Sequence, residues 1–158
     1  MSYGNSGDDR ASRASWSQII LKPKQFEVIY QITHELSNCP DERLDQEGMS
    51  PEGVAVLIEC IDSLRSLVER SSMVRIRVID EPNVDFQEFS ALNPVSEYSR
   101  NEWEAVGELP QDIAAIWQQL LRFVVSWLGQ RELFLRTGYS LNEVNAAIDE
   151  LVVRRAPT

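Results

Sequence analysis

Few residues of this chain are suited to acid–base or nucleophilic chemistry, and they lie far apart in the sequence. His34 is its single histidine, and Cys39 and Cys60 are its two cysteines. No Ser-His-Asp or Cys-His relay can be placed by motif around His34. A zinc site needs four ligands at suitable spacing, and one histidine with two cysteines falls short of that set. We therefore expect no catalytic residues and no metal.

The sequence also lacks the motifs that hold common cofactors. It contains no Gly-x-Gly and no Gly-Lys-Ser or Gly-Lys-Thr, the patterns of phosphate-binding loops. Cys60 lies in an apolar stretch and is expected in the core, whereas Cys39 lies in a polar loop where it could be exposed. Both are expected to be free thiols of a reducing compartment. The residues therefore favour a protein without a cofactor that is not an enzyme.

The chain is acidic, and its acidity is concentrated in one segment. The net charge is −10, from 25 acidic and 15 basic residues. Between Asp80 and Glu108 there is a single base, Arg100. The eight acids of this segment are Asp80, Glu81, Asp85, Glu88, Glu97, Glu102, Glu104 and Glu108. We expect the segment to be a solvated linker or an acidic patch that attracts a basic partner.

Charge and length exclude several classes of protein. Nucleic-acid binding depends on Lys and Arg that neutralise phosphates, so neither DNA nor RNA is expected as a partner, and an anionic membrane surface is disfavoured for the same reason. The 158 residues suit one ordinary domain or two very small ones. No apolar run approaches the roughly 18 residues of a membrane-spanning helix. Residues 1–15 lack the apolar block of a secretory signal, so we expect a disordered tail and a cytoplasmic protein.

Turn and cap signals predict two helices in the first half of the chain. Pro23 suits the first turn of a helix that ends near Leu36, because a proline there loses no hydrogen bond. A Gly-Met-Ser-Pro-Glu run then starts a second helix, with Ser50 as N-cap and Pro51 at the first helical position. This helix is expected to reach about Arg70, with apolar residues along one face at alternating spacings of three and four. Together the two helices form a predicted hairpin.

The second half begins with a different periodicity. Residues 74–78 alternate Val or Ile with Arg, as a half-buried strand does, although a continuation of the preceding helix is the alternative. A third helix is expected from Pro110 to a break at Gly129, with an apolar surface wide enough to be buried on more than one side. Ser140 and Glu143 form a predicted capping box at the start of a last helix.

The end of the chain repeats features of its beginning. Gly-Met-Ser and Gly-Tyr-Ser turns each open a helix, and each half has an earlier helix that starts at a proline. Duplication and the convergence of two capped hairpins both explain this echo. Arg154 and Arg155 are expected to close the last helix favourably against its dipole.

These elements predict a mostly α fold. Two helical hairpins, residues 16–72 and 110–158, are expected to pack as a small bundle. Residues 73–109 would form an acidic linker between them, with a short strand near 74–79. The disordered tail, residues 1–15, would precede the first hairpin.

One stretch of the first hairpin resembles a known family. Its features, in order, are the aliphatic run Val28–Leu36, the pair Arg43-Leu44, the turn and helix start from Gly48 through Pro51-Glu52 to Ile58, and the pair Leu64-Arg65. With these features, residues 26–66 resemble the mitotic-spindle organizing (MOZART) family. The stretch departs from the family pattern in a shorter connector before Gly48 and in Gly53, where the family has alanine. The chain is also longer than the family usually is.

This resemblance implies a helical adaptor in microtubule nucleation and spindle organisation, located at the centrosome or spindle pole. The implied partners are helical extensions of γ-tubulin complex proteins. The residues that would form or support such an interface are Ile29, Ile32, Leu36, Leu44, Gly48, Pro51, Val54, Ile58, Ile61 and Leu64. The apolar members of this set are equally explained as the core of the first hairpin.

The expected function is that of a non-catalytic helical adaptor that binds other proteins in a larger assembly. The alternative is an acidic inhibitor or chaperone, for example an immunity protein that binds a basic toxin, because the acidic segment would speed association with such a partner. The Gly138-Tyr-Ser-Leu-Asn-Glu143 run also resembles the first helix of a ubiquitin-associated domain, although too few residues follow it for the other two helices. An enzyme of unrecognised type is the third hypothesis.

Overall fold

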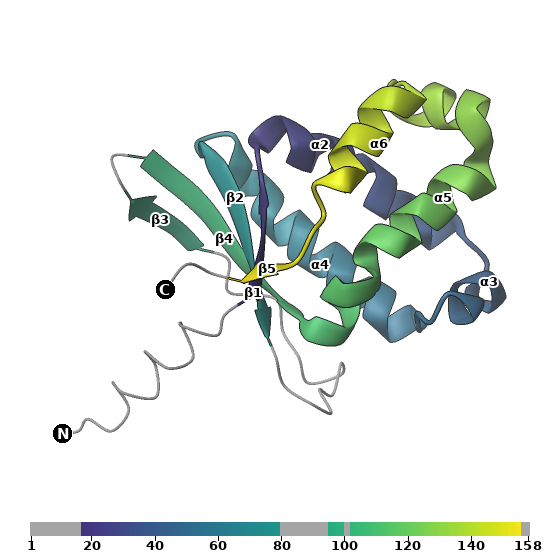
Figure 1. Ribbon diagram of the computed structural model, residues 1–158, viewed down its shortest axis with the longest axis horizontal. Helices are drawn as coiled ribbons and strands as arrows, with labels where there is room; N and C mark the ends of the chain where they lie inside the picture. Colours follow the sequence, from purple (N-terminus) through teal and green to yellow (C-terminus); the bar gives the residue numbers. More distant parts are fainter. Residues whose placement is uncertain (1–16, 80–94, 100–101, 156–158) are drawn as a thin grey trace.

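The computed structural model describes residues 17–79, 95–99 and 102–155. In these residues a layer of helices covers one face of a five-stranded sheet (Figure 1). The strands are β1 Ser17–Leu21, β2 Met73–Ile79, β3 Val95–Ser99, β4 Glu102–Pro110 and β5 Arg154–Arg155. The helices are α2 Pro23–His34, the 3-10 helix η1 Glu35–Asn38, α3 Asp41–Gln46, α4 Pro51–Val68, α5 Gln111–Thr137 and α6 Leu141–Asp149. The mostly helical prediction is confirmed, but a sheet accompanies the helices instead of one short strand.

The local signals for helix starts and stops are confirmed. Ser50 caps α4 by accepting a hydrogen bond from the Gly53 backbone N–H at 3.1 Å. Ser140 and Glu143 form the predicted capping box of α6. Gly129 interrupts α5 with a φ of 82°, a left-handed conformation that favours glycine. None of the helices in the described part of the chain is both long and apolar enough to cross a membrane.

β2 occupies the middle of the sheet, in the order β3-β4-β2-β1-β5. It pairs with β1 in antiparallel and with β4 in parallel orientation. Val74, Ile76 and Val78 are buried, while Arg75 and Arg77 between them lie on the other face. This alternation confirms the strand and excludes the alternative that the preceding helix continues.

The expected linker, residues 73–109, was wrong, because most of its described residues belong to strands. β4 runs beside β2 over its whole length, and β3 pairs with β4 in antiparallel orientation. The sequence hid β4 because two of its buried residues, Ala105 and Gly107, are small and only weakly hydrophobic. A Cβ added at Gly107 would lie 3.0 Å from Cδ1 of Leu64, so α4 packs directly on the strand backbone there. The weak hydrophobic signal of residues 102–110 therefore reflects close packing of α4 on β4, and these residues are not a solvated linker.

The two ends of the described chain meet in the sheet. β5 pairs with β1, with Arg155 opposite Ser17 and Arg154 opposite Gln18. The prediction that these arginines close the last helix was wrong, since α6 ends at Asp149. The apolar stretch before Pro23 also forms a strand, β1 Ser17–Leu21, and is not part of a helical hairpin. The pairing of such distant short segments leaves no local signal in the sequence.

The echo between the halves survives in element order but not in pairing. Each half runs from a strand into a helix that starts at or beside a proline, and later through a Gly-x-Ser turn into a second helix and a strand. β1 and β2 pair with each other directly, whereas β4 and β5 lie apart in the sheet, separated by β2 and β1. The similarity is therefore one of local chain order and capping.

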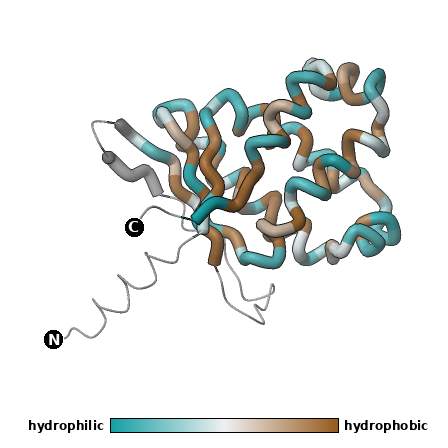
Figure 2. Tube along the Cα trace, viewed as in Figure 1, coloured by the Kyte–Doolittle hydropathy of each residue, from teal (hydrophilic) through white to brown (hydrophobic). Residues whose placement is uncertain are grey.

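The core lies between the helices and the sheet, and hydrophobic residues of both layers face it (Figure 2). Its largest fully buried side chain is Trp117 of α5. The indole Nε1–H of Trp117 donates to Thr33 Oγ1 at 3.1 Å, and that hydroxyl donates to the Ile29 carbonyl at 2.7 Å. Since a buried indole N–H needs an acceptor, this chain of hydrogen bonds links α5 to α2 at a defined register.

Replacement of Gly107 by valine should destabilise the fold. The added side chain would clash with Leu64, and overpacking of a core costs about 1–3 kcal/mol. Chemical denaturation should give the order wild type, Gly107→Ala, Gly107→Val in decreasing free energy of unfolding. Equal stability of the valine variant and the wild type would contradict the close packing of α4 on β4.

Candidate functional site

His34 of α2 lies opposite Asp62 of α4, in a cluster that the sequence spacing conceals. The two side chains approach to 2.7 Å, between Nε2 and Oδ1, and are 37% and 47% exposed. The Tyr30 ring lies 4.6 Å from the His34 ring, and the Arg65 guanidinium lies over Tyr30 at 4.3 Å. Partial burial, and then the Asp62 carboxylate, raise the pKa of the Tyr30 phenol.

This His34 cluster (Tyr30, His34, Asp62 and Arg65) ties α2 to α4 at the surface. A histidine oriented by a carboxylate could act as a base, but catalysis also needs a nucleophile or substrate within its reach. In the described part of the chain the His34 ring contacts Asp62 and Tyr30, and none of the four residues lines either hollow discussed below. Exposed ion pairs of this kind contribute about 0–1 kcal/mol, so we assign the cluster to helix packing.

The ten residues implied by the family resemblance are mostly core residues. Ile29, Ile32, Leu36, Leu44, Val54, Ile61 and Leu64 are buried between the helices or against the sheet. The resemblance implies that they form or support an interface, and burial leaves these seven no direct contact with a partner in this fold. They can only support a surface formed by others. Ile58 is half-buried, and Gly48 and Pro51 are exposed.

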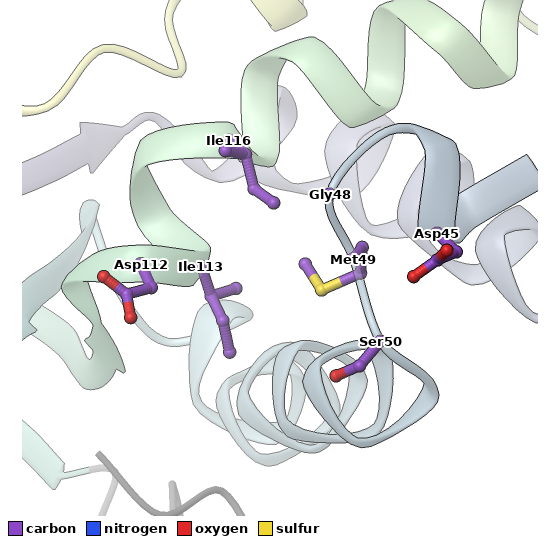
Figure 3. Close-up of a pocket in the computed structure, with 7 residues that line it drawn as sticks. All are labelled: Asp45, Gly48, Met49, Ser50, Asp112, Ile113 and Ile116. Carbon is purple, nitrogen blue, oxygen red and sulfur yellow. The ribbon is translucent and has the colours of Figure 1, made fainter. Parts of the chain in front are cut away.

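The exposed Gly48 turn forms one wall of a hollow of about 320 Å³ (Figure 3). The start of α5 forms the other wall, so the hollow lies where the two halves of the chain meet. Its lining residues are Asp45, Gly48, Met49, Ser50, Asp112, Ile113 and Ile116. Gly48 has a φ of 88°, which an L side chain rarely adopts, and this allows the turn to reverse the chain at the rim.

The chemistry of the Gly48 hollow is apolar at its centre and acidic at its sides. Met49, Ile113 and Ile116 point into the space, while Asp45 and Asp112 lie on opposite sides of it (Figure 3). An apolar floor between two carboxylates suits a long basic side chain, whose stem is apolar and whose end is charged. Asp112 also lies in the first turn of α5, where negative charge stabilises the helix.

The predicted acidic patch can be placed only in part. Asp80, Glu81, Asp85 and Glu88 lie outside the described residues, and Glu97 and Glu102 lie in β3 and β4 without described side chains. Glu104 is paired internally, since Nε and Nη2 of Arg75 each donate to its carboxylate at 3.1 Å. Nη1 of Arg75 donates to Gln18 Oε1 at 2.7 Å, so this arginine joins β4 to β1 across β2. Glu108 is half-buried.

The last turns of α5 expose two adjacent large apolar side chains. Phe134 is 55% and Leu135 is 64% exposed, whereas their neighbour Leu133 is buried. The segment is held in place by Arg136, which pairs with Glu35 at 2.9 Å and with Glu132 at 3.0 Å. We refer to Phe134 and Leu135 as the α5 apolar pair. Sequence periodicity alone did not single them out, because α5 is apolar on several sides.

No group of three or more metal-binding side chains is arranged around a common point in the described residues. Comparison with known proteins adds no family to these observations. No family model, curated protein or solved structure matches the chain. What the chain does must therefore be inferred from its own surfaces.

Both cysteines should resist thiol reagents in the folded protein. Cys39 is buried and not exposed as its polar context suggested, and Cys60 is also buried. Burial raises the pKa of the Cys60 thiol to about 12 and raises that of Cys39 as well, so little thiolate is present near pH 8. A colorimetric disulfide reagent should label neither thiol in native protein and both in urea. Rapid labelling of either native thiol would show that the surrounding helices open.

Proposed function

We propose that this chain is a non-catalytic adaptor that binds another protein in a larger assembly. The observation that carries the proposal is the α5 apolar pair, Phe134 and Leu135, which are 55% and 64% exposed. Removal of such side chains from water contributes roughly 25 cal/mol per Å² of apolar surface, so a docked partner that covers them would gain affinity. Contiguous exposed apolar surface marks protein contact sites, and these two neighbouring side chains supply the start of such a patch.

The α5 apolar pair is presented on a fixed segment, which favours recognition over incidental exposure. Leu133 anchors the segment in the core, and the Thr137 hydroxyl donates to the Leu133 carbonyl at 2.7 Å. Gly138 ends the helix in the left-handed conformation, with its N–H bonded to the Phe134 carbonyl. A surface already ordered before binding loses less conformational entropy when a partner docks.

The specific version of the proposal is an adaptor of γ-tubulin complex proteins in microtubule nucleation, at the centrosome or spindle pole. Its support is the sequence resemblance of residues 26–66 to the mitotic-spindle organizing family. Gly48 and Pro51 are the exposed residues of that resemblance, and the turn that carries them borders the Gly48 hollow. A contact of the family type would use this turn, whereas the α5 apolar pair lies outside the stretch that resembles the family.

Replacement of both Phe134 and Leu135 by aspartate should abolish partner capture. Two carboxylates at the contact would have to lose water without a compensating partner. The free energy of unfolding should fall by only about 1–2 kcal/mol, because both side chains are exposed and the loss comes from the poor helix propensity of aspartate and its charge near the helix C-terminus. The measurement is quantitative mass spectrometry of proteins that co-purify with the tagged chain, beside thermal unfolding of each variant.

The matched control is Ser126→Asp with Gln130→Asp, which adds the same charge at two exposed polar positions of α5. This control should retain the captured proteins. Equal capture by the aspartate variant of the α5 apolar pair would reject that surface as the contact site. Capture that never includes tubulin or γ-tubulin complex proteins would reject the microtubule version and leave the general one standing.

A second candidate function is the acidic inhibitor or chaperone of a basic partner. The Gly48 hollow favours it, because its two carboxylates flank an apolar floor that fits an arginine or lysine stem. Negative charge at the rim would also speed the approach of a basic surface.

Titration with n-butylguanidinium, an analogue of the arginine side chain, should shift the amide NMR signals of Gly48 and Ile116. The shift should weaken with added salt and be lost in the Asp45→Asn, Asp112→Asn variant. A Glu42→Gln, Glu69→Gln variant, with the same change of net charge at exposed positions, should respond as the wild type does. Equal shifts with neutral butanol would show an apolar hollow without preference for a cation and would reject the second candidate.

A further inference from the structure

A second hollow, of about 300 Å³, lies between α2 and α6, apart from the Gly48 hollow. Its lining residues are Lys22, Lys24, Gln25, Val28, Glu143, Ala146 and Ala147. Lys22 precedes α2, and Lys24 lies in its first turn. Glu143, Ala146 and Ala147 belong to α6. We call this hollow the lysine groove.

The lysine groove holds both lysines of the whole chain, which otherwise uses arginine for its positive charge. Each ion pair recorded among the described residues uses an arginine or His34. The two lysines are exposed and join none of these pairs. Lys24 interacts electrostatically with the Glu143 carboxylate, but neither lysine forms an ion pair within 4.0 Å among the described residues, so both ammonium groups can still meet an external carboxylate.

Glu143, the one acid in the lining, forms part of the capping box of α6. Glu143 accepts the Ser140 backbone N–H at 3.1 Å as part of the capping box of α6. Its carboxylate is therefore held toward the helix start. With two lysines against one glutamate, the lining keeps a net positive charge although the net charge of the protein is −10.

The floor of the lysine groove is apolar and open because its side chains are small. Val28 and Ala147 are buried, and the exposed Ala146 leaves space above them. The chain that continues from α6 carries two further exposed apolar side chains, Val152 and Val153, and runs beside β1 at the sheet edge (Figure 1). A bulky apolar side chain from a partner would find room between the two helices.

We propose that the lysine groove docks an acidic, amphipathic segment of a partner protein. One bulky apolar side chain enters between α2 and α6, and flanking carboxylates pair with Lys22 and Lys24. This inference rests on the proposed function, because both assume that the ligand is a protein. The lysine groove shares no residue with the α5 apolar pair. A nucleic acid fits less well, because its high charge density would be repelled by the acidic remainder of the chain.

The test uses the full chain and a fluorescein-labelled peptide of about twelve residues, with leucine at every third or fourth position and glutamate elsewhere. Fluorescence anisotropy should show binding that weakens with salt. Lys22→Glu with Lys24→Glu should weaken it by about tenfold or more, since attraction becomes repulsion at both positions. Ala146→Trp should weaken it comparably without a change of charge, because the ring would fill the groove.

The control is Arg70→Glu with Arg131→Glu, which changes the net charge equally at exposed positions outside the groove. It should bind the peptide as the wild type does. Binding that is equal in wild type, lysine and Ala146 variants, or that is as tight for the same peptide with lysine in place of glutamate, would overturn the proposal. The Phe134→Asp, Leu135→Asp variant should still bind the peptide, so failure of the proposed function and failure of this groove can be told apart.

Discussion

The hydrogen bond from Trp117 to Thr33 is the constraint around which the helical layer is arranged. The indole is fully buried, so its N–H must meet an acceptor, and the Thr33 hydroxyl provides one at 3.1 Å while it bonds to its own helix. This fixes α5 against α2. Because α2 also packs against α6, and α6 against α5, the three helices form one unit whose seams are set by that register.

The two hollows differ in charge although the protein as a whole is acidic. The Gly48 hollow borders the start of α5 and has two carboxylates, whereas the lysine groove borders α2 and α6 and has both lysines. Their apolar floors belong to the same core, so a partner at either place would extend that core outward. The α5 apolar pair lies beyond the break at Gly129, on the side of the helix that faces away from the core.

Local signals predicted the helices because caps act within one turn of the chain. Ser50 before α4 and the Ser140–Glu143 box before α6 bond to backbone groups three residues away, so their effect is visible in the sequence. The strands were harder to predict, except for β2 with its alternating valines and arginines. β4 packs through the small Ala105 and Gly107, which weakens its apolar signal, and β5 consists of two arginines paired with β1.

By itself, the sequence determined the helix starts, the core faces of those helices, the strand β2 and the acidity of the chain, since each depends on residue type and short spacing. It could not separate residues that form a surface from those that support it, and seven of the ten proposed contact residues proved to be core. Only the tertiary structure placed Asp45 and Asp112 at one hollow, Lys24 and Ala147 at another, and His34 within hydrogen-bond distance of Asp62. The physical reason is that packing between distant elements, which no local pattern records, decides which side chains remain in water.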